Sequence, residues 1–302
     1  MLTSTPRLFV LALLLSLAAP SYAQSAGPVA VVRLPFDLVG GLIVLRNLPL
    51  NDQRGDFVLD TGCQYGLLLD QTAFSTHVQP APTRGLSATG VVAQQQVPVR
   101  HFQLGSAHYA NLTAIATSLA PIRRAVGPRL LGLVGYGLLR DYEVVLDYAH
   151  RQLTCYPLNR PGPRPFTRRD SVAFTLEKGW PVVVGTIGQV PVRLLLDKGA
   201  MANNLDAVFS QRLPAPLRPR VLGSEVVIGA AGQHAAQRAL LPILTVGRTD
   251  WHDLPVVLAA LARPSSGRAL PYQGVLGFSF LSQDVLVSFH YGRRQFYALQ
   301  PQ

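Results

Sequence analysis

The sequence predicts an all-β protein built from two similar lobes with few short helices. The 302-residue chain repeats itself, because matching residues recur 142 positions apart: Gly90 and Gly232, Gly105 and Gly247, Leu112 and Leu254, Gly135 and Gly277, Leu139 and Leu281. A constant period of this kind indicates a duplicated structural unit. The apolar stretches are also short, β-branched or alternating, and bounded by Gly, Pro or Asn, which is typical of strands. We therefore expect two β lobes related by a pseudo-two-fold axis.

Individual elements follow from the same pattern. Strands are expected at residues 42–45, 56–59, 97–104, 144–148, 152–156 and 295–299. Two short helices are expected, at residues 70–77 and 205–213, each after a strand that ends in an aspartate. These aspartates, Asp60 and Asp197, are 137 positions apart, so the second unit has a five-residue insertion between Asp197 and Gly232.

The N-terminus resembles a targeting segment. Arg7 precedes an apolar run at residues 8–19, which is too short to span a bilayer. The small residues Ser21 and Ala23 then form a cleavage site, so residues 1–23 are predicted to be a signal peptide. The mature protein is expected to be exported, to the periplasm or the extracellular space. Its predicted parts are a first lobe at residues 28–157, a linker rich in Pro and Arg at 158–170, and a second lobe at 171–299.

Composition excludes several classes of protein. The net charge is +11, but the 25 Arg are scattered, which favours a solvated basic surface over a nucleic-acid site. No stretch after the leader is long and apolar enough for a membrane helix. The seven His show no metal-ligand spacing, so we expect neither a metal nor a cofactor. The two cysteines, Cys63 and Cys155, either form a disulfide or remain separate buried thiols.

The two units share a short sequence motif that contains a candidate catalytic residue. Asp60-Thr61-Gly62 follows an apolar strand in the first unit, and Asp197-Lys198-Gly199 follows one in the second. Two carboxylates held about 3 Å apart cannot both ionise, so one keeps its proton. One aspartate from each lobe therefore predicts an acid and base pair at the interface between the lobes.

These motifs resemble the retropepsin and pepsin family of aspartic peptidases, with the likeness extending over nearly the whole mature chain. The resemblance implies a bilobal acid-protease β-barrel fold, a peptide or protein substrate, no metal and no cofactor. Two units in one chain also imply a monomer. The implied site consists of the catalytic pair Asp60 and Asp197, the turn residues Thr61, Gly62, Lys198 and Gly199, the ψ-loop glycines Gly135 and Gly277, and the flap residues Thr89, Gly90, Ala231 and Gly232.

Lys198 departs from the family pattern. The family has Thr after each aspartate, and its hydroxyl both donates and accepts so that the two turns lock together; an ammonium cannot accept. Either Lys198 turns to solvent and half of the lock is lost, or it stays near the carboxylates and holds both as anions. The sequence thus leaves two functions open: an exported aspartic endopeptidase, or a non-catalytic peptide- or protein-binding module. Cys63 is either a small buried residue or an oxidisable thiol at the cleft rim.

Overall fold

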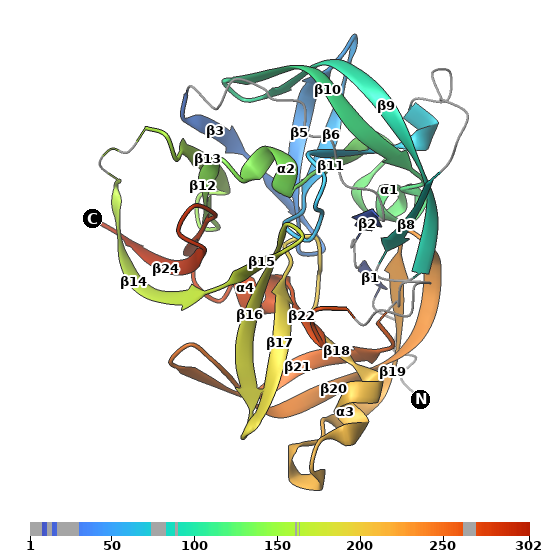
Figure 1. Ribbon diagram of the computed structural model, residues 1–302, viewed down its shortest axis with the longest axis vertical. Coiled ribbons are helices and arrows are strands. Elements are labelled where there is room, and N and C mark those ends of the chain that lie inside the picture. Colours follow the sequence, from blue (N-terminus) through green and yellow to red (C-terminus); the bar gives the residue numbers. More distant parts are fainter. Residues whose placement is uncertain are drawn as a thin grey trace.

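The computed structural model describes residues 8–10, 14–16, 30–73, 83–87, 90–160, 162, 164–261 and 270–302. Strands dominate this part of the chain, in two nine-stranded sheets and one six-stranded sheet. The first lobe occupies the upper half of Figure 1 and the second lobe the lower half, and the six-stranded sheet lies at their common side. The prediction of an all-β, two-lobed fold is confirmed.

The strands of the two lobe sheets follow each other in the same spatial order. In the first lobe the order is β2 (Leu14–Ser16), β8 (Thr83–Ser87), β9 (Gly90–Leu104), β10 (Ala107–Thr117), β7 (Leu67–Asp70), β11 (Leu130–Val134), β6 (Gln53–Leu59), β5 (Leu42–Leu50) and β4 (Asp37–Val39). In the second it is β1 (Leu8–Val10), β19 (Arg220–Gly229), β20 (Gly232–Val246), β21 (Thr249–Ala259), β18 (Asn204–Asp206), β22 (Gly274–Leu276), β17 (Val190–Leu196), β16 (Trp180–Ile187) and β15 (Thr175–Glu177). The sequence duplication is therefore a duplication of topology.

Matched glycines explain why the longest strands of each lobe turn at equivalent points. Gly105 joins β9 to β10 with φ +57°, and Gly247 joins β20 to β21 with φ +64°. Both lie in the left-handed region, which glycine enters at little cost because it has no Cβ. These turns set the antiparallel registers of the two hairpins.

The six-stranded sheet joins the lobes. Its order is β14 (Phe166–Ala173), β24 (Gln295–Pro301), β23 (Leu286–His290), β12 (Tyr142–Asp147), β13 (Gln152–Pro157) and β3 (Val32–Pro35). Three strands come from each half of the chain, and they meet at the antiparallel pair β12 and β23. Glu143 is buried at this junction, where Arg164 lies 3.2 Å from its carboxylate and Ser288 donates to it at 3.2 Å. A buried carboxylate needs such partners, so these contacts stabilise the join.

Short helices complete the described chain: η1 (Gln71–Ala73), α1 (Ala120–Val126), α2 (Tyr136–Leu139), α3 (Ala207–Arg212), η2 (Ala215–Leu217) and α4 (Phe278–Leu281). The helix expected at 205–213 is α3, whose start is capped by Asp206 accepting from the Phe209 N–H at 2.8 Å. Of the helix expected at 70–77, residues 71–73 form η1, and 74–77 lie outside the described residues. The expected strands lie within β5, β6, β9, β12, β13 and β24, apart from Tyr148, which follows the end of β12.

The linker is shorter than expected. Residues 166–170 belong to β14, which pairs with β24, rather than to a connection. β14 is the edge strand of its sheet, and its residues Thr167, Arg168 and Arg169 are all exposed. The alternation of apolar and polar residues that marks a strand is therefore missing from the sequence here. A register shift between Arg168 and Asp170 further interrupts the alternation.

The N-terminal segment contributes two edge strands. β1 runs parallel to β19, and β2 runs antiparallel to β8. The expected cleavage site at Ser21 to Ala23 lies outside the described residues. No helix in the described part of the chain has the length and apolarity needed to cross a membrane.

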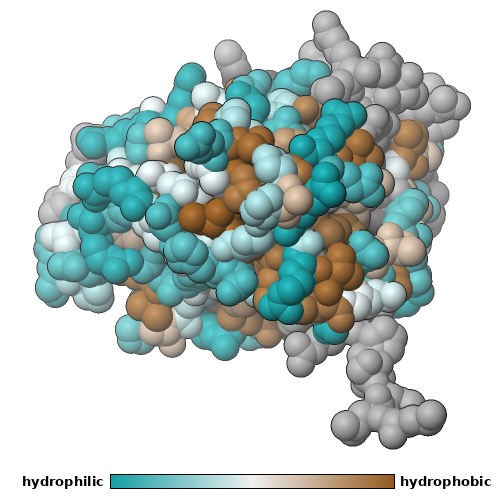
Figure 2. Space-filling model, turned by 90° about the horizontal axis from the view of Figure 1, so that it is seen from below, coloured by the Kyte–Doolittle hydropathy of each residue, from teal (hydrophilic) through white to brown (hydrophobic). Residues whose placement is uncertain are grey.

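Apolar and hydrophilic surface alternate on the outside. Figure 2 shows the face seen from below, where brown apolar patches are bordered by teal hydrophilic side chains. The largest cluster of buried side chains instead runs through both lobes, and it includes Phe57 and Phe102, whose ring centres lie 5.2 Å apart. The strand ends carrying the two aspartates emerge from these interiors.

Candidate active site

Two equivalent turns carry the aspartates. Asp60 follows β6 and its N–H donates to Val134 O at 2.9 Å; Asp197 follows β17 and donates to Leu276 O at 3.0 Å. Both acceptors lie on strands that run parallel to the aspartate strand, β11 beside β6 and β22 beside β17. Each aspartate is thus fixed at the carboxyl end of a buried strand by the same hydrogen bond.

The glycines after these neighbouring strands lie against the turns. A Cβ added to Gly135 would lie 2.5 Å from the carbonyl oxygens of Cys63 and Tyr65, and one added to Gly277 would lie 2.4 Å from that of Ala202. Side chains do not tolerate such distances, so the close approach of backbones requires glycine at both positions. The chain crossing beneath each aspartate is therefore equivalent in the two lobes.

The two carboxyl groups face each other across the interface between the lobes. A Cβ on Gly62 would lie 2.5 Å from Asp197 Cγ, and a Cβ on Gly199 would lie 2.5 Å from Asp60 Cγ. Each turn therefore packs directly on the opposite carboxyl, and both aspartates are fully buried. No metal-binding cluster of His, Cys, Asp or Glu is found in the described part of the chain.

Backbone donors hold each carboxylate in place. Asp60 Oδ1 accepts from the N–H groups of Gly62 at 2.8 Å and Cys63 at 2.9 Å, and Asp197 Oδ1 accepts from Gly199 at 2.7 Å. Burial raises the pKa of Asp60 well above its usual value, and the charge of Asp197 raises it further. Burial also raises the pKa of Asp197, although hydrogen bonds from Asp60 and the Gly199 N–H oppose the rise. The pair therefore keeps a proton at pH values where an exposed carboxyl would have lost it.

Thr61 locks the two turns together from one side. Its hydroxyl donates to Leu196 O at 3.0 Å and accepts from the Lys198 N–H at 2.9 Å. Both bonds join residues of opposite lobes and both are buried. The backbone of Lys198 thus takes part in the lock, while its side chain has no hydroxyl with which to make the reciprocal bonds.

The Lys198 side chain is fully buried, so the alternative in which it turns to solvent is wrong. Its Nζ lies 4.8 Å from the ring centre of Tyr148 and 5.5 Å from that of Phe278, and it has no hydrogen-bond partner in the described chain. The two rings meet edge to face with their centres 5.9 Å apart, one from each lobe. The side chain therefore packs against two aromatic rings, and this packing stands where a second threonine would have made hydrogen bonds between the turns.

Burial also disfavours the charged form of Lys198. It lowers the pKa of the amine well below 10.5, and the charge of Asp197 only partly opposes that effect. An amine without hydrogen-bond partners in apolar surroundings is disfavoured as a cation. The charge of Lys198 lowers the pKa of Asp197, as expected for a lysine retained here, but the lowered pKa of the amine weakens that effect.

The hairpins expected to act as flaps meet at their tips. β8 and β9 form one hairpin and β19 and β20 the other, with registers that reach Ser87 and Gly90 in the first and Gly229 and Gly232 in the second. A Cβ on Gly90 would lie 3.3 Å from the Cβ of Ala231, so the tips are in contact. Thr89 lies outside the described residues.

Two residues that the sequence did not indicate also hold the aspartate turns in place. Trp180 Nε1 donates to Gly62 O at 2.8 Å, and Asn203 Oδ1 accepts from the Gly277 N–H at 3.0 Å. The first bond crosses between lobes, and the second ties the ψ-loop of the second lobe to the turn after β17. The repeat gives one hint of this role: β16 begins with Trp180, whereas the equivalent strand of the first lobe, β5, begins with Leu42.

The two cysteines are free and buried, so the disulfide alternative is wrong. Burial raises the pKa of the Cys63 thiol, and the neighbouring charge of Asp60 raises it further. A buried thiol with a raised pKa is unreactive. Cys63 is therefore a small buried residue beneath the carboxyl pair rather than an oxidisable group at the rim.

Comparison with known proteins agrees with this geometry. A model of the aspartyl protease family matches residues 47–138 and 183–280, which together are more than half of the chain. The chain belongs to the aspartyl protease family. Each match ends within the short helix that follows a ψ-loop glycine.

Structural similarity to solved proteins is more distant. The crystal structure of basic 7S globulin from soybean is similar with a TM-score of 0.48 and 13% sequence identity, over 90% of this chain and 95% of that one. No curated protein sequence matches the chain.

Proposed function

We propose that this member of the aspartyl protease family is an exported endopeptidase whose catalytic pair is Asp60 and Asp197. The proposal rests on the arrangement of the two carboxyl groups. Both are buried, equivalent turns contribute them, and each packs against the glycine of the opposite turn. Export rests on the leader-like sequence of residues 1–23.

The proposed reaction is hydrolysis by an activated water molecule. The ionised carboxylate takes a proton from water, and the water oxygen adds to the scissile carbonyl. The protonated partner donates a hydrogen bond to the carbonyl oxygen, which stabilises the negative charge that develops there. The amide nitrogen is then protonated, the C–N bond breaks, and the pair regains its single proton. The raised pKa values of Asp60 and Asp197 support this division of roles.

An extended peptide is the proposed substrate. In the leader-like residues 1–23, strand β1 pairs with the edge of β19 and strand β2 with the edge of β8, on the side where the two hairpins face each other (Figure 1). These edges therefore accept an extended chain by backbone hydrogen bonding, which is a common mode of peptide recognition. Because both carboxyls are fully buried and the hairpin tips touch, substrate entry requires the hairpins to separate.

The test is cleavage of a diverse fluorogenic peptide library by the purified mature protein across pH 3–8. Asp60→Asn and Asp197→Asn are each expected to lower kcat/KM by at least about a hundredfold, because each removes one half of the acid and base pair. Asp253→Asn is the matched control, since Asp253 is exposed and has a φ of +48° that asparagine also adopts. Cleavage no faster than that of the Asp60→Asn variant at every pH would refute the proposal.

A second candidate is a non-catalytic module that binds peptides between the lobes. It is favoured by the one-sided lock, since only Thr61 contributes a hydroxyl to the hydrogen bonds between the turns. It predicts saturable peptide binding without turnover, and gain of cleavage in the Lys198→Thr variant. Wild-type hydrolysis that either aspartate substitution abolishes would eliminate this candidate.

A further inference from the structure

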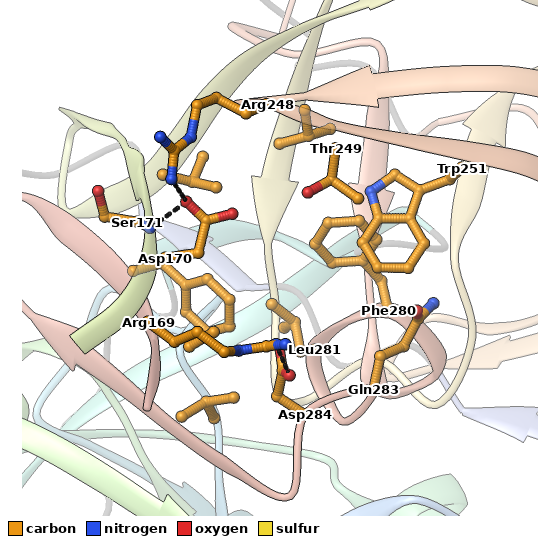
Figure 3. Close-up of a pocket in the computed structure, with 15 residues that line it drawn as sticks. Arg169, Asp170, Ser171, Arg248, Thr249, Trp251, Phe280, Leu281, Gln283 and Asp284 are labelled. Carbon is orange, nitrogen blue, oxygen red and sulfur yellow. Dashed lines mark hydrogen bonds and ion pairs between the residues drawn. The ribbon is translucent and has the colours of Figure 1, made fainter. Parts of the chain in front are cut away.

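Polar side chains outside the carboxyl pair make contacts of two kinds. At the surface they form ion pairs, as in the pocket of Figure 3, where Arg248 is paired with Asp170 at 3.1 Å and Arg169 with Asp284. Exposed ion pairs contribute little to holding elements together. In the interior, polar side chains form hydrogen bonds at the base of the first hairpin, which consists of β8 and β9. A buried polar group is costly to leave unpaired, so these bonds fix the position of the hairpin.

The base of the first hairpin lies where β9 changes its partner. Residues 90–94 of β9 pair with β8, and Gln95 is paired with Ala116 of β10. A hairpin that moves away from the carboxyl pair therefore bends near Gln94. In the second lobe, β20 pairs on both sides over residues 237–240, with β19 and with β21. The base of the second hairpin is therefore held by backbone pairing on two sides.

Two side-chain hydrogen bonds hold the base of the first hairpin. Gln94 is fully buried, and its Oε1 accepts from the hydroxyl of Tyr65 at 2.7 Å. The carbonyl oxygen of Ala93 accepts from the hydroxyl of Thr117 at 2.8 Å. Tyr65 lies in the segment that follows Asp60, between β6 and β7. Its bond to Gln94 therefore joins the hairpin directly to the turn that carries one of the two carboxyls.

Gly85 leaves room for the bond between Tyr65 and Gln94. It lies on β8, and a Cβ added to it would overlap both Nε2 and Cδ of Gln94. The side chain of Gln94 therefore crosses directly over Gly85. The φ of Gly85 lies outside the left-handed region, so glycine is needed here for space and not for backbone conformation.

The second lobe has apolar residues at all the equivalent positions. The counterparts of Tyr65, Gly85, Gln94 and Thr117 at the spacing of the repeat are Ala202, Val227, Ala236 and Ala259. None of these four has a polar side-chain atom, so neither hydrogen bond has an equivalent. They lie in or against one apolar cluster, in which a valine stands where the first lobe has Gly85. The fold therefore does not require the polar residues of the first lobe.

We propose that the hydrogen bond between Tyr65 and Gln94 is a latch, which holds the first hairpin closed over the carboxyl pair and breaks when that hairpin opens to a peptide. The inference rests on the proposed function, because it names the contact that must break before a peptide reaches Asp60 and Asp197. A single hydrogen bond between neutral groups contributes little enough for the hairpin to open and close repeatedly. The latch belongs to the free protein, so its effect is measurable without turnover.

The test is hydrogen exchange of backbone amides in the full-length protein, followed by mass spectrometry over residues 83–94 and 225–236. Amides of a locally opening element exchange in proportion to the open population. Tyr65→Phe keeps the ring and removes the donor, so exchange at 83–94 should rise about tenfold. Gly85→Ala displaces the Gln94 side chain and should raise it by a similar factor. The double variant should exchange no faster than the faster single variant, because both changes break the same bond.

Tyr109→Phe is the matched control. It also removes a buried, hydrogen-bonded hydroxyl of the first lobe, but the partner is Tyr142 and not the hairpin. It should leave exchange at 83–94 unchanged, and every variant should keep the wild-type rate at 225–236.

Unchanged exchange at 83–94 in both Tyr65→Phe and Gly85→Ala overturns the latch. An equal rise at 83–94 and 225–236 also overturns it, because the bond then stabilises the whole protein and not one hairpin. A protein that shows the expected exchange but cleaves no peptide contradicts the proposed peptidase alone. A protein that cleaves peptides but shows no change in exchange contradicts the latch alone.

Discussion

Replacing Lys198 with methionine is expected to stabilise the protein at neutral pH and to remove part of its pH dependence. Methionine keeps an unbranched side chain against Tyr148 and Phe278 but carries no amine. Wild-type Lys198 is fully buried and its pKa is lowered well below 10.5. The unfolded chain therefore binds a proton at this lysine more tightly than the folded protein does, and folding at neutral pH includes that cost.

The size of the effect follows from proton linkage. Where the unfolded state binds one proton more than the folded state, the free energy of unfolding rises by about 1.4 kcal/mol per pH unit. For Lys198 this range extends from its lowered folded-state pKa up to about 10.5. The wild type should therefore gain about 1.4 kcal/mol relative to Lys198→Met for each pH unit between the folded-state pKa of Lys198 and pH 9. The cost is fully present at low pH and disappears as pH rises to the unfolded pKa.

The measurement is urea unfolding of both proteins at pH 7, 8 and 9. Lys178→Met is the matched control, because Lys178 is exposed and is the chain's other lysine. A Lys198→Met difference that is constant over this range would refute the reasoning. It would mean that Lys198 keeps its proton in the folded state, beside a carboxyl pair that has then lost its shared proton.

Three further predictions concern the turns. Gly135→Ala should destabilise the protein by at least about 2 kcal/mol in urea unfolding, since its Cβ would lie 2.5 Å from two carbonyl oxygens, whereas Gly162→Ala should have little effect. Trp180→Phe loses the bond to Gly62 O and should lower kcat about tenfold with little change in KM, while an unchanged kcat would exclude a positioning role. The folded-state pKa of Asp60 is raised, so the contribution of its proton to stability is present at low pH and is lost as the pH rises through that pKa. Asp60→Asn should therefore gain free energy of unfolding relative to wild type as the pH increases. If the free energies of unfolding of the two proteins change in parallel with pH, this prediction is wrong.

Much of the architecture could be predicted because duplication is visible in the sequence itself. The glycine turns at Gly105 and Gly247 recur at a constant spacing, and the strands around them recur in the same order in space. Alternation of apolar residues located the strands with a buried face. It failed for β14, where an exposed edge and a register shift removed the pattern. The supporting bond from Trp180 could not be predicted, because it joins residues 118 positions apart in different lobes.

The sequence alone determined that two aspartates end equivalent strands and that a lysine follows the second. Local pattern is sufficient for this, because strand ends and tight turns depend on neighbouring residues. Only the tertiary structure decided what the lysine does, since its surroundings come from Tyr148 of one lobe and Phe278 of the other. Sequence reasoning offered a side chain in solvent or a cation beside the carboxyls. Burial without a hydrogen-bond partner instead favours a neutral amine, because charge is costly where neither water nor a protein acceptor can stabilise it.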